Sequence, residues 1–342
     1  MKRTGQPTIN DVARLSGVSK KTVSRVINRS PLLNEDTRRR VEEVIVNLGY
    51  IPNPQARALA LRRNFLIGLV HDNPNAQTVM NVQRGMLEAL HGTEFEMVVR
   101  PVDRGSATML EDLRHFLERQ RLFGVLLMPP ISENNSIARL CTEIGCRYVR
   151  MGSAVLDDPL HTVASNDKEA VRSATEYLIE QGHRRIGLVA GPHGFLSARE
   201  RREGFEQAMA AADISLPRSM IAEGNYTFES GLTAADRLLD VVPRPTAIFS
   251  CNDEMAAGVM HAAMQRGLNI PRDLSIVGFD DTPVAAHIWP PLTTVRWPIV
   301  SMARSAALKL IAAAEGDEDV EEPSMFLSTL IRRASVGPPA TG

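Results

Sequence analysis

The chain has 342 residues, beyond the size at which single cores usually stop growing, so we expect more than one domain. Its 44% hydrophobic and 23% charged residues are ordinary for a globular protein, and without a long apolar run they exclude a membrane-spanning chain. The net charge of -1 hides an asymmetry, because residues 1–63 hold 13 Lys and Arg against 5 Asp and Glu, and the remainder holds 26 against 35. A small basic segment of this kind indicates nucleic-acid binding.

Cysteine usage and the N-terminus narrow the class of protein further. Cys141, Cys146 and Cys251 are odd in number and lack paired metal-ligand spacing, so we expect neither a disulfide scaffold nor a zinc site, and no cofactor. No apolar stretch follows the N-terminal MKRTGQPT, as a signal peptide would require. We therefore expect a cytoplasmic protein with no membrane partner.

Residues 8–28, TINDVARLSGVSKKTVSRVIN, predict a short helix, a turn and a second short helix. Thr8, with Asp11 three residues on, is typical of an N-cap; Gly17 supplies the turn, and Ser19 can cap the next helix. A third helix is expected after Asn34. The spacing of apolar residues predicts one small shared core, formed by Ile9, Val12, Ala13, Val23, Val26, Ile27, Val41, Val44, Ile45 and Leu48.

This core fixes the outward face of the second helix, which carries Lys20, Lys21, Ser24 and Arg25. Basic residues on an arbitrary helix usually do no more than solvate a surface. A helix-turn-helix, however, presents the N-terminal part of its second helix to the major groove, where Lys and Arg donate to guanine. The context therefore favours DNA recognition by these side chains.

The same segment, together with GYIPNPQARALALRRNFLIGLV, closely resembles the lac repressor family of bacterial transcription regulators, over about residues 8–336. The resemblance implies that Lys20, Lys21 and Arg25 read bases. It also implies a homodimer on double-stranded operator DNA, controlled by a small-molecule effector. The remaining DNA contacts that it implies in this region are Thr8, Ser19, Thr22, Ser24, Asn28 and Tyr50.

Residues 51–63 are expected to form a hinge. Asn53 as N-cap and Pro54 at the first helical position predict a helix of roughly eight residues, too short to be stable alone, so a plain linker remains an alternative for the free protein. The family resemblance implies that this helix folds on operator DNA. Leu59 then wedges into the minor groove, flanked by Arg57, which fits minor-groove kinking.

From residue 65 onward, short apolar runs alternate with amphipathic helical ones. Strands are expected at 65–70, 95–102, 123–130 and 146–152, and again at 184–191, 247–253 and 274–281. Strands that alternate with helices predict parallel sheets, and two rounds predict two similar lobes with a ligand between them, at the carboxyl ends of the strands. We therefore expect an N-terminal all-α helix-turn-helix domain and an α/β two-lobed core like that of periplasmic binding proteins.

The domain boundaries follow from these elements and the resemblance. The helix-turn-helix domain is expected at 1–50, the hinge at 51–63 and the effector-binding and dimerisation core at 64–342. The resemblance implies that the chain crosses between lobes near 163, 292 and 323. Lobe one would comprise about 64–162 and 293–323, and lobe two about 163–292 and 324–336.

Several side chains are candidates for effector binding. Arg201 and Asp280 match family positions that hold the effector, and this pair suits sugar hydroxyls. Tyr226 lies where the family often has a stacking aromatic, and Asn252 follows a strand. The chain departs from the family in the first lobe, where NPNAQT replaces the frequent NPFF and SNDKEA replaces an Asp-Asn and glycine pattern. The polar groups that remain there favour a sugar over a purine: Asn73, Asn75 and Gln77.

Enzyme motifs are absent from the sequence. GPHG lacks the lysine of a phosphate-binding loop, neither GxSxG nor HExxH occurs, and His161, His183 and His193 are scattered. The sequence thus predicts a DNA-binding repressor controlled by a small ligand, most simply a sugar, and not an enzyme. The alternative is a soluble sugar-binding receptor with no role in gene regulation.

Overall fold

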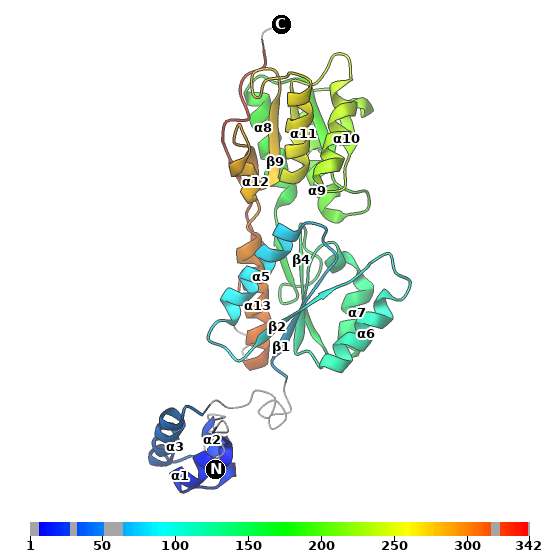
Figure 1. Cartoon of the computed structure of the whole chain (residues 1–342). Coiled ribbons are helices and arrows are strands. Elements are labelled where there is room, and N and C mark those ends of the chain that lie inside the picture. The colour runs from blue at the N-terminus through cyan, green and yellow to red at the C-terminus, as the bar shows by residue number, and fades with distance from the viewer. Residues whose placement is uncertain (1–6, 28–32, 51–63, 316–321, 341–342) are drawn as a thin grey trace. The chain divides into compact units, whose positions relative to one another are not determined.

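The computed structural model describes residues 7–27, 33–50, 64–315 and 322–340 (Figure 1). They belong to two compact units, Met1–Phe65 and Leu66–Gly342, which are described separately below. The predicted hinge and three of the predicted DNA contacts, Asn28, Arg57 and Leu59, lie outside the described residues. In the described part of the chain, no helix is long and apolar enough to cross a membrane.

The first unit contains the three predicted helices, α1 (Ile9–Ser16), α2 (Lys20–Ile27) and α3 (Glu35–Leu48). The Asp11 carboxylate accepts the Thr8 backbone N–H at 3.0 Å, and Gly17 ends α1 in the left-handed region at a φ of 68°. Val12, Val23 and Val41 are fully buried at the centre of one small core. The predicted caps and shared core are therefore confirmed.

The second unit contains two six-stranded sheets. The order of the first is β11-β5-β4-β3-β1-β2 and that of the second is β12-β10-β9-β8-β6-β7. Every pair is parallel except β12 with β10, which is antiparallel, so the predicted parallel sheets are confirmed. The strands are β1 (Leu66–His71), β2 (Glu96–Pro101), β3 (Gly124–Leu127), β4 (Arg147–Gly152), β5 (Thr162–Ser165), β6 (Ile186–Ala190), β7 (Ile221–Glu223), β8 (Ala247–Ser250), β9 (Ser275–Asp280), β10 (Thr293–Arg296), β11 (Met325–Phe326) and β12 (Thr329–Ile331).

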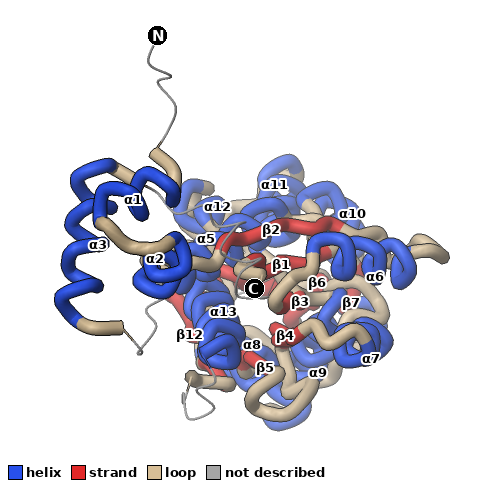
Figure 2. The backbone as a smooth tube through the Cα atoms, turned by 90° about the horizontal axis from the view of Figure 1, so that it is seen from below, coloured by secondary structure: helices blue, strands red, loops and turns tan. Residues whose placement is uncertain are grey.

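Helices enclose both sheets, so that the strands lie in the interior (Figures 1 and 2). On the first sheet, α5 packs against α13 on one face while α6 and α7 cover the other. On the second sheet, α8 packs on α9 and α10 on α11. The helices are α5 (Ala76–Leu90), α6 (Met109–Gln120), α7 (Asn135–Glu143), α8 (Asp167–Glu180), α9 (Leu196–Ala211), α10 (Phe228–Leu239), α11 (Asp253–Gln265), α12 (Pro283–His287) and α13 (Ile299–Glu315), with the 3-10 turns Ile131–Glu133 and Arg218–Met220.

The crossings between lobes differ from the expected ones. The strand β5 pairs with β4 in the first sheet, so the first crossing follows Ser165 and not residue 163. The strand β10 pairs with β9 in the second sheet, which moves the second crossing from 292 to beyond Arg296. The strand β11 pairs with β5, so the third crossing follows Phe326 and not 323. These three strands are only two to four residues long, too short for their apolar pattern to reveal which sheet they join.

Candidate DNA-binding face and effector cleft

The outward face of α2 carries exposed positive charge. Lys20, Lys21 and Arg25 are all exposed, whereas Val23 and Val26 on the opposite side are buried in the core. Lys21 and Arg25 are four residues apart, so they lie on the same face of the helix. Within the described residues, α2 contains no acidic side chain and these three cations form no ion pair. Their charge is therefore available to a polyanion outside the chain.

The hydroxyl groups near this face serve first as helix caps. Ser19 Oγ accepts the Thr22 backbone N–H at 3.1 Å and lies 2.9 Å from the Thr22 hydroxyl. The Thr8 hydroxyl donates to Asp11 Oδ2 at 2.7 Å. Tyr50 packs against the small core, and this burial raises the pKa of its phenol. DNA contacts by these residues, and by half-buried Ser24, stay predictions.

The second unit contains a cleft lined from both lobes. It lies where the polar loops follow the carboxyl ends of the strands, as parallel sheets predict. All predicted effector contacts line it except Gln77, whose side-chain amide donates to Asn81 Oδ1 at 3.2 Å. Its lining comprises Asn73, Asn75, Thr78, Pro129, Pro130 and Ser153 from the first lobe, Phe195, Ser197, Arg201, Tyr226, Asn252 and Asp280 from the second, and Trp297 near the second crossing.

Arg201 is the most constrained side chain of the cleft. It projects from α9, is only 4% exposed, and its Nε donates to Asp167 Oδ2 at 2.8 Å. Its Nη1 donates to the Cys251 carbonyl at 2.6 Å, and its guanidinium carbon lies 3.6 Å from the centroid of the Phe279 ring. Burial alone would lower the pKa of this guanidinium, but Asp167 and other nearby groups outweigh burial and raise it. Arg201 therefore stays charged inside the protein.

Asp280 ends β9 in an unusual backbone conformation. Its φ is 110° and that of Asp281 is 55°, values that non-glycine residues rarely adopt. Asp281 is held in place by Arg296 at 2.7 Å and Arg333 at 2.6 Å, which stabilise the bend. The Asp280 side chain is 11% exposed and lies 3.8 Å from Arg201, and burial raises its pKa well above the usual range. Strain of this kind is typical of functional positions.

A second carboxyl group lies fully buried behind Asp280. Asp253, the first residue of α11, accepts hydrogen bonds from the Thr282 backbone N–H at 2.7 Å, the Thr282 hydroxyl at 3.0 Å and the Thr294 hydroxyl at 2.6 Å. Burial raises the pKa of Asp253 to about 7, although these hydrogen bonds oppose the shift. Asp253 does not line the cleft. Its bonds to Thr282 and Thr294 instead join the segments around β9 and β10.

Tyr226 fits the cleft because its neighbour is a glycine. A Cβ atom at position 191 would collide with the Tyr226 ring, so only glycine can occupy this position while the ring stays where it is. Tyr226 itself has a φ of 69°, and its backbone carbonyl accepts a hydrogen bond from Asn252 Nδ2 at 3.0 Å. Asn252 Oδ1 in turn accepts the Met255 backbone N–H at 3.0 Å as the N-cap of α11. Asn252 therefore shapes the cleft, with one amide hydrogen left for a ligand.

Ser153, Phe195 and Trp297 are among the lining residues that sequence reasoning missed. Ser153 and Phe195 follow β4 and β6, so the rule that ligands bind at strand carboxyl ends could have identified them. Trp297 had no such signal, because its strand β10 was not predicted. Its indole N–H donates to Ser165 Oγ at 3.0 Å, and Ser165 Oγ donates to Asp167 Oδ1 at 2.6 Å. Hydrogen bonds thus connect the first two crossings to the carboxylate that holds Arg201.

The lobes meet closely around the cleft. Glu133 of the first lobe accepts the Leu196 backbone N–H of the second at 2.9 Å, and the Arg104 guanidinium carbon lies 4.0 Å from the centroid of the Phe195 ring. The space left among the lining side chains is narrow, about 40 Å³. A sugar needs more space, so its entry requires the lobes or the side chains to move.

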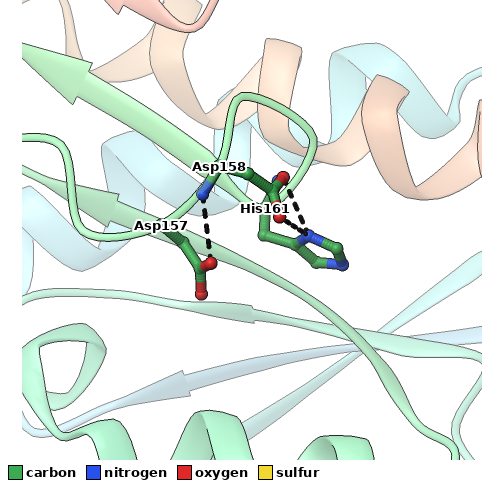
Figure 3. A group of neighbouring side chains, drawn as sticks. All are labelled: Asp157, Asp158 and His161. Carbon is green, nitrogen blue, oxygen red and sulfur yellow. Dashed lines mark hydrogen bonds and ion pairs between the residues drawn. The ribbon is translucent and has the colours of Figure 1, made fainter.

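Asp157, Asp158 and His161 form a separate cluster in the loop between β4 and β5 (Figure 3). His161 Nδ1 lies 2.9 Å from Asp158 Oδ2, and Asp157 Oδ2 accepts the Tyr148 hydroxyl at 2.9 Å. Asp157 also lies 3.6 Å from Arg150. These contacts within the loop and with β4 account for the cluster, and none of its members lines the cleft.

Family models match both units of the chain. Residues 8–53 match the model described as bacterial regulatory proteins, lacI family, and residues 175–336 match a periplasmic binding protein-like domain. The lac repressor dimer bound to operator and an anti-inducer has the same fold, with a TM-score of 0.81 and 28% identity over 97% of this chain and all of that one. The structure of the transcriptional regulator CelR in complex with cellobiose matches with a TM-score of 0.71 and 32% identity, over 96% of this chain and 99% of that one.

Two relatives named as transcriptional regulators match over nearly the whole length of the chain. The probable HTH-type transcriptional repressor ExuR of Bacillus subtilis is 32% identical over 96% of this chain and 98% of its own. The HTH-type transcriptional regulator GalS of Salmonella typhimurium is 35% identical over 96% of both chains. These relatives are transcriptional regulators, neither enzymes nor transport receptors, which agrees with the repressor and not with the receptor alternative. The chain belongs to the lacI family of bacterial regulatory proteins.

Proposed function

We propose that this protein is a repressor whose binding to operator DNA is controlled by a small sugar in the cleft of its core. The observation that carries the proposal is the presence, in one chain, of an exposed cationic face on a helix-turn-helix and of a polar cleft between two lobes. CelR, a relative of similar length, is known in complex with cellobiose. The site of action would be the cytoplasm, where bacterial operator DNA lies.

The DNA-binding part of the proposal assigns base contacts to Lys20, Lys21 and Arg25. One helix of eight residues reaches only a few base pairs, so a specific operator requires two copies in a symmetric dimer. The lac repressor, which shares the fold, is known as a dimer on its operator. A homodimer is therefore part of the proposed function.

The effector part of the proposal assigns ligand contacts to Asn75, Arg201, Tyr226, Asn252 and Asp280. A ligand changes operator affinity only if it binds one conformation of the core more tightly than another. The narrow cleft supports a difference in sugar affinity between two conformations of the core, because a sugar would bind more tightly to a more open or rearranged one.

A gel-shift assay with DNA from upstream of the protein's own gene tests the proposal. We expect a specific complex at low salt whose affinity changes when the right sugar is added. A protein that binds sugars but none of these DNA fragments would instead be the receptor considered as the alternative. Retention of sugar binding and loss of operator binding on deleting residues 1–63 would assign the two activities to the two units.

A further inference from the structure

The helix α9 begins without a cap of its own. The first N–H groups of a helix have no partner inside it, and they carry a partial positive charge that an acceptor or an acidic side chain can satisfy. The residue before α9 is Phe195, whose side chain makes no such hydrogen bond, and the first turn contains no acidic residue. The neighbouring helices α8, α10 and α11 each have an acidic residue in their first turn. The start of α9 is therefore open to an acceptor from elsewhere in the chain.

Glu133 supplies that acceptor from the other lobe. Its Oε2 accepts the Leu196 backbone N–H at 2.9 Å, and the Ser197 backbone N–H also donates to this carboxylate. Burial raises the pKa of Glu133, while these two hydrogen bonds oppose the rise. Glu133 ends the 3-10 turn that follows β3 in lobe one, whereas α9 belongs to lobe two. One carboxylate thus caps a helix across the boundary between the lobes.

The turn that carries Glu133 is anchored in its own lobe. Arg150 on β4 is only 3% exposed, and its Nε donates to the Ser132 carbonyl at 2.6 Å. Its Nη2 donates to Asn135 Oδ1 at 2.9 Å, and the Glu133 backbone N–H donates to the Pro130 carbonyl at 3.1 Å. Because the backbone on both sides of Glu133 is held, the lobes can separate beyond the reach of one side chain only if the hydrogen bonds to α9 break.

The cap lies beside the cleft but does not form part of its lining. Pro129 and Pro130, just before the turn, line the cleft, and so do Phe195 and Ser197 at the start of α9. Glu133 instead lines a separate and wider hollow of about 610 Å³. A substitution of Glu133 therefore changes how two walls of the cleft are held together without removing a group that lines it.

A second contact across the boundary is weaker. The guanidinium of Arg104, from lobe one, lies over the Phe195 ring at 4.0 Å. The same guanidinium is paired with Asp72 of its own lobe at 3.3 Å, and the Arg104 side chain is 45% exposed. Solvent and the competing carboxylate weaken its hold on lobe two. Glu133 is therefore the stronger of the two connections.

We propose that Glu133 is a positioning residue that holds the cleft closed in the ligand-free protein by capping α9 across the lobe boundary. An equilibrium between conformations shifts when one of them loses a stabilising contact. Removing this side chain therefore favours the more open core that admits a ligand, and ligand binding becomes tighter although no ligand contact is gained. The closing role concerns the core alone, and only its consequence for ligand affinity rests on the proposed function.

Hydrogen exchange of the full-length protein tests the cap. In Glu133→Ala the Leu196 and Ser197 amides lose their acceptor, so peptides that cover the start of α9 should exchange about three- to tenfold faster. Glu143→Ala is the matched control, because Glu143 also belongs to lobe one but pairs with Arg114 of the same lobe and is 61% exposed. Unchanged exchange at the start of α9 in Glu133→Ala overturns the proposal.

Fluorescence quenching tests the closing role without sugar or DNA. Trp289→Phe leaves Trp297, which is 9% exposed and lines the cleft, as the sole tryptophan. In this background, Glu133→Ala is expected to raise the quenching of Trp297 by acrylamide about twofold or more, whereas Glu143→Ala should leave it unchanged.

Glu133→Gln separates loss of the cap from general disruption. This variant is less at risk of misfolding, and it keeps an oxygen that can accept the two N–H groups of α9, so its rise in quenching should be smaller than that of Glu133→Ala. No rise in Glu133→Ala, or an equal rise in Glu133→Gln, contradicts the capping role.

Calorimetry with galactose, ribose and cellobiose relates the closing role to function. Any of these sugars that binds the unmodified protein is expected to bind Glu133→Ala about three- to tenfold more tightly. Equal or weaker binding to the variant overturns the proposed effect on affinity. If none of these sugars binds either protein, the proposed sugar effector fails, while exchange and quenching still decide the role of Glu133.

Discussion

Positive charge occurs in two contrasting settings in this protein. Lys21 and Arg25 of α2 are exposed and make no ion pair within the described residues, whereas Arg201 of α9 is buried and bonded to Asp167 and the Cys251 carbonyl. An exposed cation is stabilised by hydration and stays available to a partner outside the chain, but a buried one needs counter-charges and hydrogen-bond acceptors within the fold. A substitution on the exposed face of α2 can therefore change function without changing stability. In the cleft, a substitution of Arg201 changes both.

Arg201→Ala should have the largest effect, on both stability and ligand response. Removing the guanidinium leaves Asp167 buried without its counter-charge, and breaking a buried pair in this way typically reduces the free energy of unfolding by about 3–5 kcal/mol. Urea denaturation of the full-length protein measures the change. Effector response is expected to be lost as well, since the variant also lacks a proposed ligand contact.

The neighbouring arginine provides the control for this variant. Arg202 pairs with Glu206 at 2.7 Å on the same helix, but both side chains are 42% exposed. Arg202→Ala should therefore reduce stability by less than about 1 kcal/mol. Similar losses in the two variants would contradict the distinction between buried and exposed charge.

The buried carboxyl group of Asp253 should give stability a specific pH dependence. Its pKa is about 7 in the folded protein and about 4 in an unfolded chain, so between these values the folded state holds a proton that the unfolded state has released. The free energy of unfolding therefore falls as pH rises, by at most about 1.4 kcal/mol per pH unit, and levels off above about pH 7.

Urea denaturation between pH 4 and 8 tests this dependence. Asp253→Asn keeps the shape of the side chain but cannot ionise, so the variant should lack this part of the decline. Asp280 contributes in the same direction, and the charge of Asp253 helps to raise its pKa, so the difference between the two curves reports the titration of Asp253 together with its effect on Asp280. Parallel curves would mean that Asp253 is ionised throughout the range.

The sequence predicted features that depend on neighbouring residues better than features that depend on distant ones. The cap at Thr8, the turn at Gly17 and the outward face of α2 depend on residues close together in the chain, and all were predicted correctly. The lobe crossings were predicted only to within a few residues, because β5, β10 and β11 owe their sheet to partners far away in the sequence.

The cleft was predictable in part. Arg201 and Asp280 were identified by family resemblance, and both line it, whereas Gln77 faces Asn81 instead. No local pattern could show that Asp167 would hold Arg201, because 34 residues separate them. Ser153 directly follows β4, so the rule that ligands bind at strand carboxyl ends could have identified it.

On the exposed face, Lys21→Ala should weaken operator binding by about 1–3 kcal/mol and leave sugar binding and folding unchanged. Arg40→Ala on α3 removes the same charge from another exposed position of this unit and serves as the control. Fluorescence anisotropy with operator and random DNA separates base contact from general attraction. Equal losses on the two DNAs would make Lys21 a phosphate contact and not a base contact.

The two tryptophans allow a buried side chain to be compared with an exposed one of the same type, with the smallest expected effect. Trp297 is 9% exposed and its indole N–H donates to Ser165, whereas Trp289 is 81% exposed. Trp297→Phe keeps an aromatic ring but removes the donor, so the free energy of unfolding should fall by about 1 kcal/mol, while Trp289→Phe should change it by much less. Because the chain has only these two tryptophans, each variant leaves one fluorophore, and urea titration followed by fluorescence reports unfolding at the crossing or at the surface. Equal stability of the two variants would mean that the hydrogen bond to Ser165 contributes nothing, and that the connection from the crossing to Asp167 and Arg201 is made by packing alone.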